Sequence, residues 1–318
     1  MQFYDIFNGD ADGLCALQQL RLEEPRESVL VTGVKRDVRL LERVTARPGD
    51  ELTVLDISLS ANAAALARLL GQGARCRYFD HHAPGDVPQH PNFKAYIDTA
   101  PDICTSLIVD RYLGGRHRMW AVVAAFGDNL PEAARRSAAA LELDEAETER
   151  LRELGECVNY NAYGESLEDL HYDPADLFQT LHGYRDPREF IDSEPVLEVL
   201  RNALADDLSR VEALAPEFER QACALYVLPD AAWSRRIHGL YANRLARKRP
   251  ERAHALLVRT REGYAVSVRA PVAHPHGADT LCMKFETGGG RKAAAGINLL
   301  PEAELKRFIA GFERAFPA

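Results

Sequence analysis

The 318-residue sequence lacks the cysteine pattern of a zinc ribbon or an iron–sulfur site, because no two of its six cysteines stand in C-x-x-C spacing. It also has no run of about 18 apolar residues that would cross a membrane. Its first residues carry no basic and apolar leader. We therefore expect reduced, mostly buried thiols in a soluble cytoplasmic protein with no membrane partner.

An excess of positive charge is also missing. The chain has 39 lysine and arginine residues against 48 aspartate and glutamate residues, which gives a net charge of −9. Proteins that follow long nucleic acids usually present a basic surface to the phosphates. The charge balance therefore disfavours a long nucleic-acid track but is compatible with a local site for a small anionic ligand.

The first half of the chain alternates short apolar runs with helical segments. The runs read as strands at residues 2–7, 28–34, 50–58 and 74–80. The helical segments lie at residues 12–24, 61–73 and 102–114. This alternation predicts βαβ units and a parallel sheet, and hence an α/β fold.

The pattern changes in residues 186–216, which read as amphipathic helix with prolines and no strand. Strands return beyond this segment, and two of them are joined by a Glu262-Gly263 turn. We therefore predict a first domain over residues 1–185, a helical linker over 186–216 and a smaller α/β domain over 217–318. A length of 318 residues with 46% hydrophobic content suits two domains.

Carboxylates stand at four places that read as the ends of apolar strands. Two of these places are motifs, namely Asn8-Gly9-Asp10-Ala11-Asp12 and Asp80-His81-His82, and the other two are the single residues Asp56 and Asp128. Ligands gather at the C-terminal edge of a parallel sheet, so we expect a common site there. Carboxylate and imidazole ligands suit Mn²⁺ or Mg²⁺ and tolerate Zn²⁺ or Co²⁺.

Each acid also has a purely structural interpretation. Asp10 and Asp12 can cap the helix that begins at Gly13, and Asp56 can cap the helix after it. Ser58 and Ser60 are also available for that second cap. Asp128 can be an ordinary turn acid.

These motifs, in this order, resemble those of the DHH phosphoesterase family. The segment FETGGGRKAAAGINL, with Gly288, Gly289 and Gly290, resembles the glycine-rich signature of the associated DHHA1 substrate domain. The chain is thus similar to RecJ-like and nanoRNA-degrading phosphoesterases. The resemblance implies a parallel-sheet DHH catalytic domain followed by a smaller α/β DHHA1 domain. Two residues depart from the pattern, since Asn8 and Arg291 both stand where many members have histidine.

The resemblance implies two Mn²⁺ ions, with Mg²⁺ or Co²⁺ as alternatives. One ion would be held by Asp10 and Asp56, with Asn8 as a weak neutral ligand. The other ion would be held by four side chains, with Asp56 bridging: Asp12, Asp56, His81 and Asp128. A hydroxide between the ions would be the nucleophile. His82 would face the phosphate, and Asp80 would orient a histidine.

The second domain would bind the rest of the substrate. The triple glycine lets backbone N–H groups approach an anion, and we predict that the following RKAAAG segment begins a helix whose N-terminus favours negative charge. Arg291 and Lys292 would then contact phosphate. Arg269 would also meet substrate, according to the resemblance.

We therefore expect a two-domain, metal-dependent phosphodiesterase with its site between the domains, acting on oligoribonucleotides of a few residues or on linear dinucleotides. One alternative is a phosphomonoesterase or a pyrophosphate or polyphosphate hydrolase of the same superfamily. Another is a non-catalytic nucleotide sensor, which the departures at Asn8 and Arg291 favour. The oligomeric state is open, and a homodimer is compatible with the sequence.

Overall fold

The computed structural model describes residues 1–317 and divides the chain into two compact units. The first unit is Met1–Arg201, and the second begins at Asn202. The division falls inside helix α9 (Val196–Glu212), within the segment for which the sequence predicts a helical linker. Among residues 1–317, no helix combines the length and the apolar character needed to span a bilayer.

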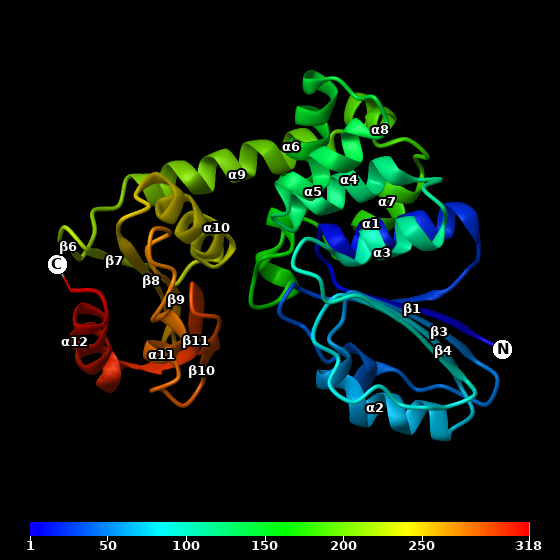
Figure 1. Cartoon of the computed structure of the whole chain (residues 1–318), viewed down its shortest axis with the longest axis horizontal. Helices are drawn as coiled ribbons and strands as arrows, with labels where there is room; N and C mark the ends of the chain where they lie inside the picture. The colour runs from blue at the N-terminus through cyan, green and yellow to red at the C-terminus, as the bar shows by residue number, and fades with distance from the viewer. Residues whose placement is uncertain (318) are drawn as a thin grey trace. The chain divides into compact units, whose positions relative to one another are not determined.

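A five-stranded sheet forms the centre of the first unit (Figure 1). Its strands are β1 (Phe3–Phe7), β2 (Val29–Val31), β3 (Glu51–Leu55), β4 (Arg75–Asp80) and β5 (Phe93–Ile97). The order across the sheet is β2-β1-β3-β4-β5, and every pairing is parallel. The predicted parallel sheet is confirmed. The edge strand β5 was not predicted from the sequence.

Helices cover both faces of this sheet. Figure 1 shows α2 (Leu59–Gly71) on one face and α1 (Ala11–Glu23) with α3 (Thr105–Tyr112) on the other. Side chains alternate between the faces, so Val54 and Tyr78 pack towards α2 and the neighbouring Phe79 is buried on the opposite side. Because all the strands are parallel, their C-terminal ends lie together at one edge of the sheet, between the two layers of helices.

Further helices complete the first unit. They are α4 (Arg118–Gly127), α5 (Pro131–Ala139), α6 (Glu145–Asn161), α7 (Pro174–His182) and α8 (Pro187–Ser193), with short 3₁₀ turns at Leu40–Arg43 and Leu167–Asp169. The apolar run that ends at Asp128 is therefore helix α4 and not a strand, so that part of the prediction is wrong. A buried helix and a buried strand can both be apolar throughout, and periodicity does not separate them.

A glycine contact brings α4 very close to α6. A Cβ atom added to Gly155 would lie 2.1 Å from the carbonyl oxygen of Val123. A Cβ atom added to Gly127 would lie 2.5 Å from the Cβ of Ala11 in α1 and 2.8 Å from the carbonyl oxygen of Gly155. Helices α1, α4 and α6 thus meet where only glycine fits, and Asp128 follows this contact directly.

We predict that Gly155→Ala destabilises the protein although alanine is the better helix former. The propensity gain is about 1 kcal/mol, whereas forcing a methyl group against a backbone carbonyl typically costs about 1–3 kcal/mol or more. The measurement is the free energy of unfolding in urea. Gly71→Ala is the matched control, because a Cβ atom at the end of α2 meets nothing within 4 Å. Equal stability of the two variants would show that α4 and α6 can separate freely.

A six-stranded sheet forms the second unit. Its strands are β6 (Phe218–Glu219), β7 (Cys223–Leu228), β8 (Ala253–Thr260), β9 (Gly263–Arg269), β10 (Gly288–Gly290) and β11 (Ala294–Pro301). The order is β10-β11-β9-β8-β7-β6, and only the β7–β8 pairing is parallel. Its helices are α10 (Ala232–Lys248), α11 (Ala278–Cys282) and α12 (Leu305–Ala315), with a 3₁₀ turn at Glu302–Glu304. The predicted smaller α/β unit is confirmed.

The helix predicted after the triple glycine is wrong. Gly288–Gly290 form strand β10, which pairs antiparallel with β11. Ala295 and Ile297 alternate into the core while β11 also pairs with β9. Burial and pairing on both sides of β11 outweigh the helix propensity of an alanine-rich segment.

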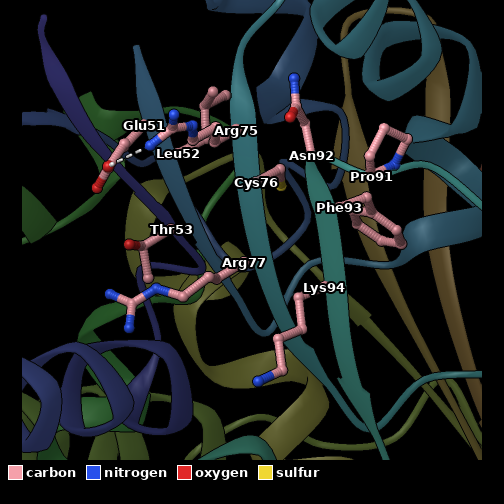
Figure 2. Close-up of a pocket in the computed structure, with 10 residues that line it drawn as sticks. All are labelled: Glu51, Leu52, Thr53, Arg75, Cys76, Arg77, Pro91, Asn92, Phe93 and Lys94. Carbon is pink, nitrogen blue, oxygen red and sulfur yellow. Dashed lines mark ion pairs between the residues drawn. The ribbon is translucent and has the colours of Figure 1, made fainter. Parts of the chain in front are cut away.

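A hollow of about 560 Å³ lies at the N-terminal ends of β3, β4 and β5, at the edge of the sheet opposite to the acidic motifs (Figure 2). Its basic side chains have partners within the first unit. Arg75 lies 3.8 Å from Glu51, and Arg77 lies 2.8 Å from Glu24. The Nζ atom of Lys94 lies 5.0 Å from the centre of the Tyr96 ring. These partners account for the basic side chains of the hollow without a ligand.

Candidate metal centre

The first motif joins strand β1 to helix α1. Asp10 is the N-cap of α1, and its Oδ1 accepts hydrogen bonds from the backbone N–H groups of Asp12 at 3.0 Å and Gly13 at 3.1 Å. The structural interpretation of Asp10 as a cap is therefore correct. Its other oxygen, Oδ2, points elsewhere and contacts a lysine described below.

Asp12 lies in the first turn of α1 but contacts the beginning of a different helix. Its two carboxylate oxygens accept the backbone N–H groups of Thr105 and Ser106, each at 2.7 Å, at the N-terminus of α3. A carboxylate has about four lone-pair sites, so these bonds leave room for a cation. Asp12 thus ties α1 to α3 and keeps its charge at the common edge.

Asp56 follows strand β3 in a backbone conformation that is rare for a residue with a side chain. Its φ angle is 58°, in the left-handed region. Such strain collects at functional sites and costs on the order of 1–3 kcal/mol. Asp56 does not cap helix α2, because Ser58 accepts the N–H of Ala61 at 3.4 Å and does so instead.

His81 lies between two of the acids. Its Nδ1 is 3.0 Å from the carbonyl oxygen of Ile103, and a carbonyl can only accept, so Nδ1 carries a hydrogen. Its Nε2 lies 3.4 Å from Asp56 Oδ1 and 3.9 Å from Asp128 Oδ2. A histidine held by one ring nitrogen in this way presents the other nitrogen to a metal.

The second histidine is held by Asp80. His82 Nδ1 lies 2.7 Å from Asp80 Oδ1, which also accepts the backbone N–H of His82 at 3.2 Å. The His82 side chain is 41% exposed, whereas Asp80 is completely buried. Asp80 therefore orients His82 and leaves its Nε2 available to a ligand.

Two groups of side chains have the geometry to hold a cation. They are Asp12 with His81 and Asp128, and Asp56 with His81 and His82. In each group the ligand atoms lie within 4.8 Å of one another. Among residues 1–317, neither group includes Asp10.

Lys35 also belongs to this site, although no sequence motif marks it. Its Nζ lies 2.5 Å from Asp10 Oδ2, 3.6 Å from Asp128 Oδ1 and 3.3 Å from Asn159 Oδ1. Lys35 follows strand β2 in an irregular segment outside every motif. The one available signal was a lysine placed after an apolar strand, at the same sheet edge as the acids.

Burial and like charge dominate the electrostatics of the centre. Burial raises the pKa of Asp56 well above its ordinary value, and the charges of Asp12 and Asp10 raise it further, against the opposing effect of His81. Burial also raises the pKa of Asp128, to about 6, although Lys35 opposes the shift. These carboxylates are costly to ionise together without a cation.

For the two basic residues, His81 and Lys35, the neighbouring acids favour the charged form. Burial lowers the pKa of His81, but its hydrogen bond to Asp56 and the charges of Asp12 and Asp128 raise it overall to about 10. Burial opposes ionisation of the Lys35 and Asp10 pair as well, yet their contact raises the pKa of Lys35 and lowers that of Asp10. The oxygen and imidazole donors fit a divalent ion, which would replace the Nε2 proton of His81.

The residues expected to bind substrate lie in the second unit. Arg269 donates from Nε to Asn243 Oδ1 at 2.6 Å and from a terminal nitrogen to Ser267 Oγ at 3.1 Å. Arg291 and Lys292 are exposed in the turn between β10 and β11. The expected helix N-terminus is not formed there, so the helix-dipole argument for anion binding at Arg291 does not apply.

No protein-family model and no curated protein matches the sequence. Several solved structures match nearly its full length. A DHH-domain member of the s1p family of ribosomal proteins is 12% identical with a TM-score of 0.63, covering 98% of this chain and 86% of that one. The exonuclease RecJ bound to manganese is 18% identical with a TM-score of 0.60, and the match covers 99% of this chain and 91% of RecJ. The pGpG-specific phosphodiesterase PggH from Vibrio cholerae is 15% identical with a TM-score of 0.57, covering 98% and 97%.

The chain has the fold of the DHH-domain proteins. The match extends over both units, and the DHH fold accounts for the parallel sheet of the first and the mixed sheet of the second. The acidic cluster described above lies at the C-terminal edge of the first of these sheets.

We predict that Asp56→Gly loses metal binding but gains stability in metal-free buffer. Glycine adopts a positive φ without strain, which is worth roughly 1 kcal/mol, and the buried charge disappears. Asp56→Ala should be less stable than Asp56→Gly, because alanine keeps the strain. Urea unfolding with and without Mn²⁺ measures both effects.

The matched control is Glu142→Gly, an exposed residue with a φ angle of 57°. It should gain stability and keep the full stabilisation by Mn²⁺. Retained Mn²⁺ stabilisation in Asp56→Gly would remove Asp56 from the metal centre.

Proposed function

We propose that the protein is a divalent-metal-dependent phosphoesterase that hydrolyses short nucleotidic phosphodiesters. The observation that carries the proposal is the buried cluster of carboxylates around His81 at the C-terminal edge of the parallel sheet. The fold supports it, since the similar structures include RecJ bound to manganese and a pGpG-specific phosphodiesterase. Hydrolysis of a phosphoester is one of the reactions that such a donor set serves.

The cation would be Mn²⁺ or a similar ion such as Mg²⁺ or Co²⁺. The resemblance assigns it to four side chains, of which all but Asp56 form one of the two groups described above: Asp12, Asp56, His81 and Asp128. When bound, such an ion polarises a phosphoryl oxygen and lowers the pKa of a coordinated water. The side chains contribute orientation, because hydrogen bonds to α3 and to Ile103 already hold Asp12 and His81 in place.

His82 would act on the substrate. Asp80 fixes its ring through Nδ1, so the exposed side chain can donate a hydrogen bond from Nε2 to a phosphate oxygen when the ring is in its imidazolium form. Fixed donors of this kind stabilise the charge that develops in a transition state. His82 also lies in one of the two possible metal groups, so the two histidines are compared by mutation below.

A short substrate is favoured over a long strand. The chain carries a net charge of −9, which opposes sliding along many phosphates. The likeness to PggH supports a linear dinucleotide as the first compound to test. Arg269, Arg291 and Lys292 of the second unit are the residues that we propose contact its distal part.

The deciding experiment is a substrate panel with purified protein and Mn²⁺. We expect turnover of pGpG, pApA and short oligoribonucleotides, little turnover of long strands, and loss of activity with EDTA. Asp56→Ala should reduce the rate about 100-fold or more, since it removes a ligand at the centre of the cluster. Turnover confined to pyrophosphate or to monoesters would select the alternative hydrolase, and binding without turnover would select the nucleotide sensor.

We predict different phenotypes for the two histidines. His81→Ala should lower the Mn²⁺ content, measured by elemental analysis, because Nε2 is the nitrogen that faces Asp56 and Asp128. His82→Ala should retain the ion but lose turnover. His90→Ala, in the loop that follows, serves as the control and should change neither quantity. Equal loss of metal from His81→Ala and His82→Ala would make His82 a ligand and contradict its role at the phosphate.

A further inference from the structure

The Lys35 ammonium group is surrounded by acceptors at the Asp10 side of the centre. It contacts Asp10 at 2.5 Å, Asn159 at 3.3 Å and Asp128 at 3.6 Å, and it lies 5.7 Å from the centre of the Tyr163 ring. These are contacts that a bound cation would make with the same groups. The group is thus a cation at the metal centre that belongs to the chain itself.

The backbone holds Lys35 in this place from two sides. Its N–H donates to the carbonyl oxygen of Ala162 at 2.9 Å. Its carbonyl oxygen accepts from Nδ2 of Asn8 at 3.3 Å. The other amide atom of Asn8, Oδ1, accepts the N–H of Asp10 at 3.3 Å. Both ends of the Asn8 amide therefore support the loop and the acid.

The charges at the centre are consistent with a single metal ion. Four carboxylates meet at the centre and would carry four negative charges when all are ionised; Asp10, Asp12 and Asp56 are buried, and Asp128 is partly buried. One divalent ion and the Lys35 ammonium would together offset three of these charges. A second divalent ion at Asp10 would lie beside the ammonium and be repelled by it.

We propose that the Lys35 ammonium takes the place of one of the two metal ions that the motifs imply, so that the centre holds one divalent ion. That ion lies among Asp12, Asp56, His81 and Asp128, and Lys35 serves Asp10 as a fixed cation. The inference rests on the proposed metal-dependent function but makes a separate statement about stoichiometry. Asn8 and Lys35 act as a pair, because the amide that replaces a ligand also holds the lysine loop.

The test measures Mn²⁺ bound per chain by calorimetry and by elemental analysis of the full-length protein. Wild type should bind one Mn²⁺ and give the electron paramagnetic resonance spectrum of an isolated ion. The double variant Asn8→His with Lys35→Met removes the ammonium and supplies an imidazole ligand, and it should bind two. Its spectrum should show exchange coupling between two ions. Lys35→Arg keeps the charge and should bind one.

Lys94→Met is the matched control, because it removes a lysine on β5 away from the acids and should leave one Mn²⁺. If Lys35→Met variants do not fold, Lys35→Gln retains a polar group beside Asp10 and replaces them. Two Mn²⁺ ions in wild type, or one in the double variant, would overturn the assignment of Lys35. No Mn²⁺ in wild type would instead overturn the proposed function, and the inference with it.

Discussion

Repulsion among buried carboxylates is the constraint on which the rest of the first unit depends. Burial and mutual repulsion raise the pKa values of Asp56 and Asp128, and a cluster of this kind forms only if positive groups compensate it. His81 and Lys35 supply part of the compensation from side chains. A bound cation would supply the remainder, so the same repulsion that destabilises the cluster would strengthen its binding of a metal ion.

Helix ends supply a second part of this compensation and also determine the geometry. Asp10 accepts N–H groups at the start of α1, and Asp12 accepts N–H groups at the start of α3, where the helix dipole favours negative charge. Asp128 reaches the same edge only because Gly127 and Gly155 let α4 approach α1 and α6. The position of each acid is thus coupled to the packing of a different pair of elements.

The sequence predicted the features that depend on local patterns. Strand ends of a parallel sheet meet at one edge, so the acids after β1, β3 and β4 could be placed together from the amino-acid pattern alone. The edge strand β5 is half-buried and shows no clean alternation, so it was missed. Asp128 was placed after a strand because a buried helix is apolar on every side. The hairpin at Gly288–Gly290 depends on pairing with distant strands, which propensity does not contain. Lys35 has no periodic context at all.

Asn8 shows why a departure from a motif has to be interpreted together with its neighbours in space. Considered alone, an amide in place of an imidazole is a weaker ligand and suggests a weaker centre. In the structure, its Nδ2 holds the backbone of Lys35, and the ammonium of that lysine contacts the adjacent acid. Asparagine in place of histidine removes an imidazole ligand, and its amide supports the loop that carries the Lys35 ammonium. A change that appears to degrade the site when only the motif is considered is, in three dimensions, the exchange of one cation for another.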